Sequence, residues 1–238
     1  MIPPREHFLG KLVRFPLALL PKNFVTPILA GPLRGKKWVV GSSVHGCWFG
    51  SYESQKQRLV AEALSPGQVV YDIGANAGLY SLLASVAVGP NGRVFAFEPV
   101  KENVLYLERH LALNRISNCF VVRAAVCAED GMNQFDFSDD RSKGRLSMQG
   151  TESVPTIRLD SFFAADRQKR RPDFMKIDVE GGEAQVLEGA VSLLKECSPI
   201  VCVAIHSPDL DVYCNRFLTS FGYKVRQIGP YDLWASKD

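Results

Sequence analysis

The segment that most limits the fold of this chain is an apolar run that ends in an acid and two closely spaced glycines. Its sequence is Val69-Val70-Tyr71-Asp72-Ile73-Gly74-Ala75-Asn76-Ala77-Gly78. Beyond this run the apolar residues recur with helical spacing, at Leu79, Leu82, Leu83 and Val86. This order predicts a buried strand, a glycine loop and a helix. Glycine permits positive φ and the close approach of a ligand, and a helix N-terminus offers unpaired N–H groups. We therefore expect a nucleotide-type binding loop.

Strands and helices are predicted to alternate after this loop. With helical spacing between them, further strands are expected at 94–97, 119–122, 173–177 and 200–205, and a closing antiparallel pair at 223–228 and 231–235. Two more strand-like segments, 133–137 and 154–159, flank a polar stretch that we expect to be a loop, 138–152. The pattern predicts an α/β domain with a mixed, mainly parallel sheet and helices on both faces. In such sheets, ligands bind beyond the carboxyl ends of the strands.

Residues 1–50 are predicted to be an N-terminal extension that acts as a lid or packing element on the domain formed by residues 51–238. The first 35 residues hold six prolines, and Lys37–Val40 and Val44–Phe49 are interpreted as the two strands of a hairpin. Residues 8–20 are apolar and basic, so a weak contact with a membrane surface is the alternative role for that segment.

Composition narrows the class of protein. A length of 238 residues suits one α/β domain with an adequate core. The net charge of +3, without a long basic run, argues against a nucleic-acid partner. No apolar run reaches the roughly 20 residues of a membrane span. The six cysteines show neither a C-x-x-C pair nor metal-ligand spacing with histidine, which is typical of reduced core residues in a cytoplasmic protein.

Two acids at strand ends indicate the kind of ligand. Asp72 occupies the position where a pyrophosphate-binding loop has its first glycine. A carboxylate there would repel a pyrophosphate but suits a sulfonium or ammonium group, as in S-adenosylmethionine. Glu98 ends the next strand, 20 residues beyond Gly78, the spacing at which dinucleotide-type folds place an acid for the ribose hydroxyls. Glu98 thereby disfavours the alternative of a tight turn without a ligand.

Charged residues also mark the predicted strand at 173–177. Lys176 and Asp178 are expected on one face, and Glu180 follows on the same side. Burial of each such charge costs roughly several kcal/mol unless it is paired or binds a ligand. We favour a polar floor of an active site, because the run ends at the carboxyl edge beside the glycine loop. A structural ion pair of Lys176 with Asp178 or Glu180 is the alternative.

His206 ends the next strand at the same edge. It can face Asp178 or Glu180 across the cleft, and imidazole titrates near neutral pH. A purely structural histidine is one alternative. Another is that Asp178, Glu180 and His206 hold a divalent cation that acts as a Lewis acid on a hydroxyl.

Several of these segments resemble the FkbM-type S-adenosylmethionine-dependent methyltransferases. The resemblance spans about residues 50 to 206, and its least specific part is the glycine loop, which many methyltransferases share. The other matching segments are Phe97-Glu98-Pro99, the family's Tyr–Glu pair at Tyr52-Glu53 and, above all, Lys176-Ile177-Asp178-Val179-Glu180-Gly181-Gly182-Glu183, with Leu187-Glu188-Gly189-Ala190 behind it. The resemblance implies a Rossmann-like methyltransferase fold with a seven-stranded sheet, and O-methyl transfer.

The same resemblance implies a cofactor site. The methionine part of S-adenosylmethionine would lie on the loop residues Gly74, Ala75, Asn76 and Gly78, near Asp72 and the pair Tyr52 and Glu53. The ribose hydroxyls would bind Glu98. The adenine would lie by Pro99 and by the small residues Ala124, Ala125 and Val126. The family often has an acid shortly before the histidine of the fifth strand, whereas this chain has Val203-Ala204-Ile205-His206.

These observations predict an S-adenosylmethionine-dependent O-methyltransferase that acts on a hydroxyl of a small molecule or glycan, such as a sugar or a polyketide. Methyl transfer depends mostly on alignment and on a base that removes the hydroxyl proton. His206 or Asp178 is the candidate base, and Lys176 would orient the carboxylates or lower the pKa of the acceptor hydroxyl. The alternatives are a nicotinamide-dependent oxidoreductase, which Asp72 disfavours, and a non-catalytic binding module, which the intact charged residues disfavour.

Overall fold

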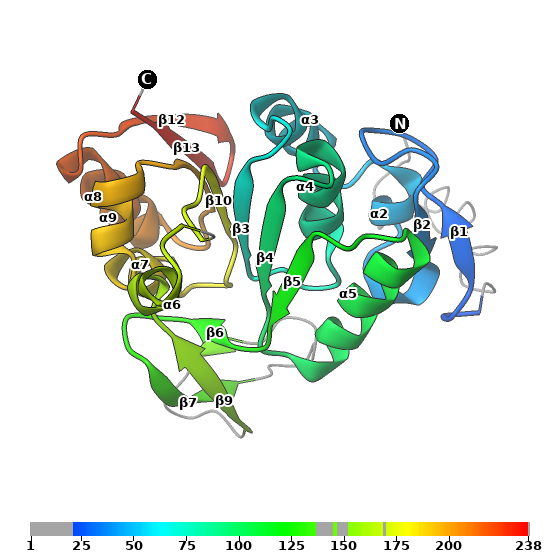
Figure 1. The fold of residues 1–238 in the computed structure, drawn as a ribbon, viewed down its shortest axis with the longest axis horizontal. Helices are drawn as coiled ribbons and strands as arrows, with labels where there is room; N and C mark the ends of the chain where they lie inside the picture. Colours follow the sequence, from blue (N-terminus) through cyan, green and yellow to red (C-terminus); the bar gives the residue numbers. More distant parts are fainter. Residues whose placement is uncertain (1–20, 137–144, 147–151, 169, 238) are drawn as a thin grey trace.

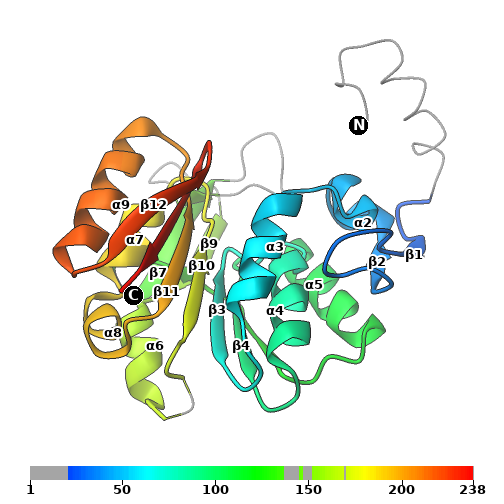
Figure 2. The same ribbon diagram turned by 90° about the horizontal axis from the view of Figure 1, so that it is seen from above.

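The computed structural model describes residues 21–136, 145–146, 152–168 and 170–237. A seven-stranded sheet runs through its centre and separates two layers of helices (Figures 1 and 2). In spatial order, the strands of this sheet are β12 (Lys224–Gly229), β13 (Asp232–Ser236), β11 (Ile200–Ala204), β10 (Phe174–Ile177), β3 (Val69–Ile73), β4 (Arg93–Phe97) and β5 (Cys119–Val122). Only β13 is antiparallel to its two neighbours, so the predicted mixed, mainly parallel sheet is confirmed.

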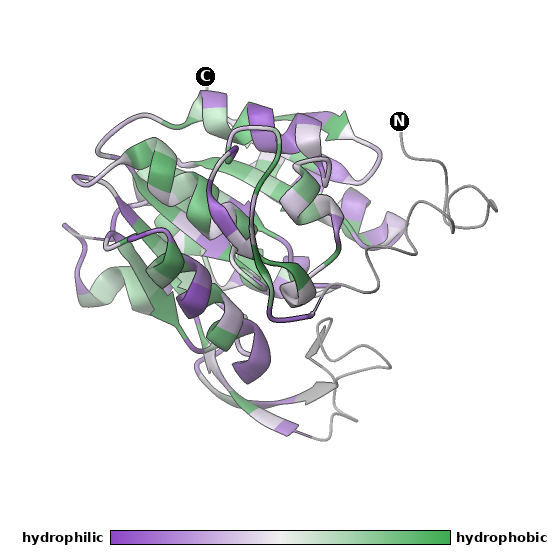
Figure 3. Cartoon of the chain, turned by 90° about the vertical axis from the view of Figure 1, so that its right-hand side faces the viewer, coloured by the Kyte–Doolittle hydropathy of each residue, from purple (hydrophilic) through white to green (hydrophobic). Residues whose placement is uncertain are grey.

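Helices cover both faces of the sheet, as predicted. Figure 2 shows three of the longer helices on one side, namely α3 (Ser54–Ala63), α4 (Leu79–Val88) and α5 (Lys101–Leu113). The other side carries α6 (Leu159–Ala165), α7 (Glu183–Glu188), α8 (Val191–Cys197) and α9 (Pro208–Ser220). The strands are coloured mainly as hydrophobic in Figure 3, which fits a parallel sheet that is buried on both faces.

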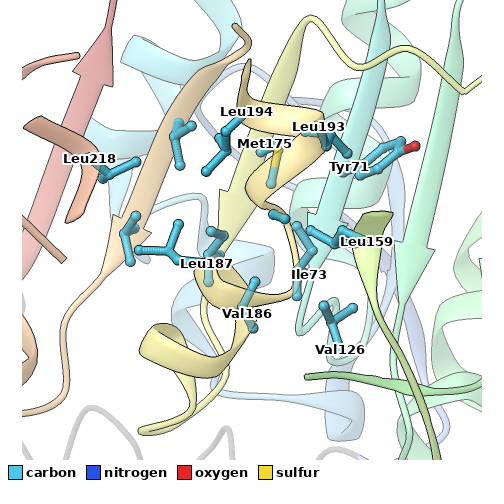
Figure 4. Packing of buried hydrophobic residues seen from close by; sticks show 14 of the residues in the cluster. Tyr71, Ile73, Val126, Leu159, Met175, Val186, Leu187, Leu193, Leu194 and Leu218 are labelled. Carbon is cyan, nitrogen blue, oxygen red and sulfur yellow. The ribbon is translucent and has the colours of Figure 1, made fainter. Parts of the chain in front are cut away.

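Alternate residues of each central strand face different cores. Tyr71, Ile73, Met175 and Ile177 pack with Val186, Leu187 and Leu194 under α7 and α8 (Figure 4). Val70 and Phe174 face the other way, toward α3 and α4. This period of two places Asp72 and Lys176 on the α3–α4 face, and the register of β3 and β10 pairs these two residues directly.

The chain order of the strands creates a switch point between β3 and β10. From β3 the chain proceeds outward to β4 and β5, and later it returns to β10 and β11 on the opposite side of β3. Helices that leave such neighbouring strands go to opposite faces, which opens a crevice at the carboxyl ends of the strands. The glycine loop follows β3 and the charged residues follow β10, so both predicted parts of the site lie at this crevice.

A second, four-stranded sheet lies beside the main one. It consists of β6 (Ala125–Val126), β9 (Glu152–Ile157), β7 (Gly131–Asp136) and β8 (Arg145–Leu146). The strands β7 and β9 confirm the two segments predicted from their alternation. Most of the polar stretch 138–152, predicted to be a loop, lies outside the described residues, but its residues 145–146 form a strand.

The predicted hairpin of residues 37–49 is wrong in its second strand. Strand β2 (Lys37–Val39) does form, but it pairs with β1 (Val25–Pro27), and a turn of 3-10 helix follows at Val40–Ser42. The segment predicted as the partner strand contains helix α2 (Gly46–Phe49) instead. A short apolar run cannot distinguish the two states. The helix is fixed by Gly50, which adopts a φ of 76° and caps its end, and by the hydrogen bond from Trp48 Nε1 to His45 Nδ1 at helical spacing.

The segment that precedes α3 is attached to the glycine loop by a buried histidine of α5. His110 Nδ1 lies 2.7 Å from the carbonyl oxygen of Ala77, and His110 Nε2 accepts a 3.0 Å hydrogen bond from the backbone N–H of Val39. The imidazole stacks on Trp38 with ring centroids 3.7 Å apart. Because Nε2 accepts, the single proton of the neutral ring is on Nδ1. Burial lowers the pKa of His110 to about 4, so this ring stays neutral at neutral pH.

Two further expectations concern the surroundings of the chain. None of the helices in residues 21–136, 145–146, 152–168 and 170–237 has the length and apolar character needed to cross a membrane. Residues 8–20, for which a weak membrane contact is predicted, lie outside the described residues. All six cysteines are described, and none of them forms a disulfide.

The neutral state of His110 predicts a pH-dependent stability. The unfolded chain binds the proton near pH 6.5 and the folded chain only near pH 4, so the free energy of unfolding falls as the pH drops through this window. We expect His110 to account for a loss of about 3 kcal/mol. Urea denaturation of the wild type and of His110→Gln measures the effect. The variant should be less stable at pH 7 but lose less stability toward pH 4, and equal losses would contradict a buried neutral imidazole.

Candidate functional site

A cavity of about 1060 Å³ opens at the carboxyl ends of β3, β4, β10 and β11. Its size exceeds that of most sites for one small ligand, which leaves room for a donor and an acceptor. Every residue that the sequence predicted for the site lines this cavity except Asp72 and Gly78. Those that do are Tyr52, Glu53, Gly74, Ala75, Asn76, Glu98, Pro99, Ala124, Ala125, Val126, Lys176, Asp178, Glu180 and His206.

The two glycines of the loop are required by the protein's own packing. Gly74 has a φ of 75°, and a Cβ built there would lie 1.9 Å from the carbonyl oxygen of Asp178. Gly78 has a φ of 90° as the N-cap of α4, and a Cβ there would lie 2.9 Å from Leu107 Cγ. The loop can therefore lie against both the end of β10 and helix α5 only because these positions lack a side chain.

Glu98 is a buried acid that shapes the loop. Its Oε2 accepts a 2.7 Å hydrogen bond from the backbone N–H of Asn76, a residue held at a φ of 50°. Its Oε1 accepts bonds from the N–H of Val100 at 2.9 Å and from Asn103 Nδ2 at 3.2 Å. Burial raises the pKa of Glu98, against the opposing effect of these hydrogen bonds. The carboxylate thus holds the loop through the N–H of Asn76 and also lines the cavity.

Lys176 connects the two halves of the site. Its ammonium lies 3.4 Å from Asp72 Oδ1, 3.4 Å from Asp178 Oδ2 and 3.3 Å from the carbonyl oxygen of Gly74. Burial alone would lower the pKa of Lys176, but the carboxylates of Asp178 and Asp72 outweigh it and raise this pKa. Asp178 shows the converse, because Lys176 holds its pKa below the usual value despite burial. Lys176 and Asp178 thus form an ion pair and also line the floor of the cavity, so both interpretations of these charges describe the same residues.

Asp72 lies beneath the cavity rather than in its wall. Its side chain is almost fully buried, and its Oδ2 accepts a 2.6 Å hydrogen bond from Ser81 Oγ of α4. Its other oxygen faces Lys176. Asp72 therefore acts on the cavity through Lys176 and through the helix that follows the loop.

A second buried lysine was missed from the sequence. Lys56 of α3 lies 3.0 Å from Glu53 Oε1 and 2.8 Å from Asp232 Oδ1, and only 6% of its side chain is exposed. Glu53 also accepts a 2.8 Å hydrogen bond from the hydroxyl of Tyr80 and adopts a φ of 45°, which is uncommon for a residue with a side chain. Lys56 and Asp232 are 176 residues apart in the chain, and no sequence motif marked either of them.

His206 is surrounded by three carboxylates. Its Nδ1 lies 2.8 Å from Glu183 Oε1, and its Nε2 lies 3.5 Å from Glu180 Oε2 and 3.7 Å from Asp178 Oδ1. The hydrogen bond to Glu183 is the largest cause that raises the pKa of His206. The predicted proximity of His206 to Asp178 and Glu180 is thus present. Glu183 is part of the segment that resembles the FkbM family, but the sequence assigned it no role.

The side chains of this cluster contact one another directly, at 2.8 to 3.7 Å between His206 nitrogens and carboxylate oxygens. Across the part of the chain that the structure describes, no group of three or more His, Cys, Asp or Glu side chains is arranged to hold a metal ion. The divalent-cation alternative for Asp178, Glu180 and His206 therefore gains no support from this geometry.

The sequence resembles known methyltransferases over most of its length. Residues 72–225 match the family model of the methyltransferase FkbM domain. A hexuronic acid methyltransferase, AglP of Haloferax volcanii, is 28% identical over 153 residues, which cover 63% of this chain and 61% of that protein. Methyltransferase 1 of Beauveria bassiana is 27% identical over 143 residues, or 50% of this chain and 57% of that protein. The chain thus spans about three fifths of the length of these curated relatives.

Solved structures show the same fold. An FkbM methyltransferase from Methylobacillus flagellatus superposes with a TM-score of 0.55 at 16% identity, covering 80% of this chain and 53% of that one. A precorrin-6y C5,15-methyltransferase from Geobacter metallireducens gives a TM-score of 0.50 at 17% identity, covering 77% and 89%. These likenesses place the seven-stranded sheet and its helices among methyltransferase folds, as the sequence predicted.

The close approach of Gly74 to β10 gives a matched test of the site. Gly74→Ala should cost several kcal/mol of stability, about 1–2 kcal/mol of it from the positive φ, and should abolish binding of S-adenosylhomocysteine in calorimetry. Gly35→Ala is the control, because Gly35 has a φ of 84° with nothing within 4 Å of the added Cβ. It should cost only the conformational part and leave binding intact. Equal behaviour of the two variants would show that the contact with Asp178 does not matter.

Proposed function

The chain belongs to the FkbM family of S-adenosylmethionine-dependent methyltransferases, and on that premise we propose that it methylates a hydroxyl of a glycan or of another small molecule. The observation that carries this proposal is the arrangement of the cavity. The glycine loop and Glu98, which follow β3 and β4, and the residues Asp178, Glu180 and His206, which follow β10 and β11, line one cavity. A donor bound at the first group and an acceptor bound at the second would meet at the switch point of the sheet.

The residues present fit S-adenosylmethionine. Gly74 brings the loop to the cavity without a side chain, and Glu98 offers oxygens to ribose hydroxyls. Pro99 and the small residues Ala124, Ala125 and Val126 give an apolar wall for the adenine. Glu53 and Glu180 add negative charge that suits a ligand with sulfonium and ammonium groups. When bound, S-adenosylmethionine supplies a methyl group whose transfer to oxygen leaves a neutral thioether and releases the hydroxyl proton.

His206 is the group that would take this proton. A base is more effective when its pKa is closer to the working pH, and the carboxylates around His206 raise its pKa, whereas Lys176 lowers that of Asp178. Nε2 of His206 lies on the cavity side, with Asp178 and Glu180 beside it. We therefore assign proton acceptance to His206, and to Asp178 the orientation of the acceptor hydroxyl through a hydrogen bond. Lys176 holds Asp178 in place.

The charge of the cavity favours a neutral acceptor. Glu53, Asp178, Glu180 and Asp232 line the cavity. Lys56 and Lys176 are buried there and already paired with Glu53, Asp232 and Asp178, and Lys22 is the exposed lysine among the described lining residues. A uronic acid or a nucleic-acid phosphate would add negative charge to this surface. We propose a neutral sugar or alcohol as the acceptor, although one relative is named for hexuronic acid.

The unpaired cysteines support a cytoplasmic location for the reaction.

Ligand binding and acceptor choice test this proposal. Calorimetry should show micromolar binding of S-adenosylmethionine and S-adenosylhomocysteine and no heat with NAD. In a radiolabelled methyl-transfer assay, methyl glucoside or an aliphatic polyol should accept the methyl group better than glucuronic acid. Heat with NAD alone would indicate an oxidoreductase, and no heat with any of the three would indicate a binding module. Preferred transfer to glucuronic acid would overturn the argument from charge.

Substitution of the proposed base separates chemistry from binding. We expect His206→Ala to lower kcat roughly 100-fold or more, because a positioned base contributes a factor of about 10²–10⁴. Asp178→Asn should lower kcat less and should raise the KM of the acceptor. Calorimetry with S-adenosylhomocysteine is the control, and its Kd should change less than about threefold in both variants. If both variants keep most of their activity, neither residue moves the proton.

A further inference from the structure

Glu183 is a fully buried acid to which the reaction described above gives no role. It is the first residue of α7, and its Oε1 accepts a 3.0 Å hydrogen bond from the backbone N–H of Gly181. The same oxygen lies 2.8 Å from Nδ1 of His206. Its second oxygen, Oε2, is buried and has no hydrogen-bond partner among the described residues. A role in capping the start of α7 would explain the hydrogen bond with Gly181. It would not explain why an acidic side chain contacts His206.

The geometry determines where His206 carries its proton. A carboxylate can only accept hydrogen bonds, so Nδ1 of His206 must be the donor in its contact with Glu183. The neutral imidazole then has its lone pair on Nε2, the nitrogen that faces Asp178 and Glu180 in the cavity. With the other tautomer, Nε2 would carry a hydrogen and could not accept the proton of a hydroxyl.

We propose that Glu183 is a positioning residue that holds His206 with its proton on Nδ1, so that Nε2 can accept the proton of the acceptor hydroxyl. This inference rests on the proposed function, because the lone pair on Nε2 matters only if a hydroxyl reacts. In the balanced step, the hydroxyl oxygen bonds to the methyl carbon while the methyl–sulfur bond breaks. Sulfur keeps the electron pair of that bond, and the proton passes to Nε2. Glu183 then stabilises the resulting imidazolium.

The charges around His206 set the direction of its titration. The hydrogen bond that His206 donates to Glu183 raises the pKa of His206 most, burial opposes it, and Asp178 and Glu180 raise it further. On the strand beside β11, Asp232 of β13 is neutralised by Lys56.

Two other neighbours carry charges. Helix α9 begins at Pro208 with Asp209 and Asp211 in its first turn, and Lys176 of β10 is paired with Asp178. The acids next to the imidazole thus all favour its charged form, and the neutral base forms as the pH rises through the raised pKa.

The first test needs no acceptor. The chain has four histidines, and ¹⁵N NMR of their side chains reports both tautomer and pKa, with His206 assigned by the signal lost in His206→Ala. In the wild type we expect a neutral form protonated on Nδ1 and a pKa above 6.5. Glu183→Gln should lower that pKa by about one and keep the tautomer, because its amide oxygen can remain on Gly181. Glu183→Ala should lower the pKa and mix the tautomers.

The second test uses methyl transfer to methyl glucoside, or to the best acceptor of the panel above, as a function of pH. For Glu183→Gln, the acid limb of the kcat profile should move to lower pH. The kcat on the plateau should fall roughly tenfold, as when a residue that orients a reactive group through a hydrogen bond is replaced. The KM of S-adenosylmethionine should change less than twofold. In the His206→Ala background, Glu183→Gln should have no further effect on kcat.

Glu188→Gln is the matched control on the same helix, since Glu188 is exposed and its side chain bonds only Tyr213 among the contacts described. It should leave the pKa of His206 and the pH profile unchanged. An unchanged His206 pKa in Glu183→Gln, or a wild-type neutral form protonated on Nε2, would overturn the role of Glu183. Failure of S-adenosylhomocysteine to bind the wild type would instead overturn the proposed function. The NMR result would still decide whether Glu183 sets the tautomer and the pKa of His206.

Discussion

The site depends on one buried cation, the ammonium of Lys176. The parallel register of β3 and β10 pairs Lys176 with Asp72, and the next residue on the same face is Asp178. One charge therefore compensates two carboxylates and also bonds the carbonyl oxygen of Gly74. If it were removed, the buried Asp72 and the partly exposed Asp178 would both lose their partner, and an uncompensated buried charge such as that of Asp72 costs roughly 3–5 kcal/mol. The glycine loop and the charged floor of the cavity are thus held in one arrangement by the same ion.

Much of this arrangement was predictable, because it follows from short-range periodicity and from topology. The period of two placed Lys176 and Asp178 on one face, and the rule for carboxyl edges placed His206 beside them. What could not be predicted depends on how distant elements pack. The pairing of Lys56 with Asp232 requires the position of α3 relative to β13, and the contact of Glu183 requires the direction in which α7 leaves β10.

The error at residues 44–49 has a different physical origin. A run of six residues is too short for its apolar pattern to show a period of two or of 3.6. Its helix is determined by features outside the pattern, namely the left-handed conformation of Gly50 and a side-chain bond between Trp48 and His45. As a consequence, Cys47 and His45 line the cavity from this short helix and its approach rather than from a strand.

One part of the cavity lining lies inside the stretch that matches the family model, and another part lies outside it. The family model matches residues 72–225, which include the glycine loop, Glu98 and the segment from Lys176 to His206. The wall formed by residues 38–56 and by Asp232 lies outside that match, although it lines the same cavity. His110 bonds this wall to Ala77 of the loop, so its position is fixed relative to the donor. The family model therefore covers the glycine loop and the charged residues from Lys176 to His206, and we propose that the wall outside this match contributes to the choice of acceptor.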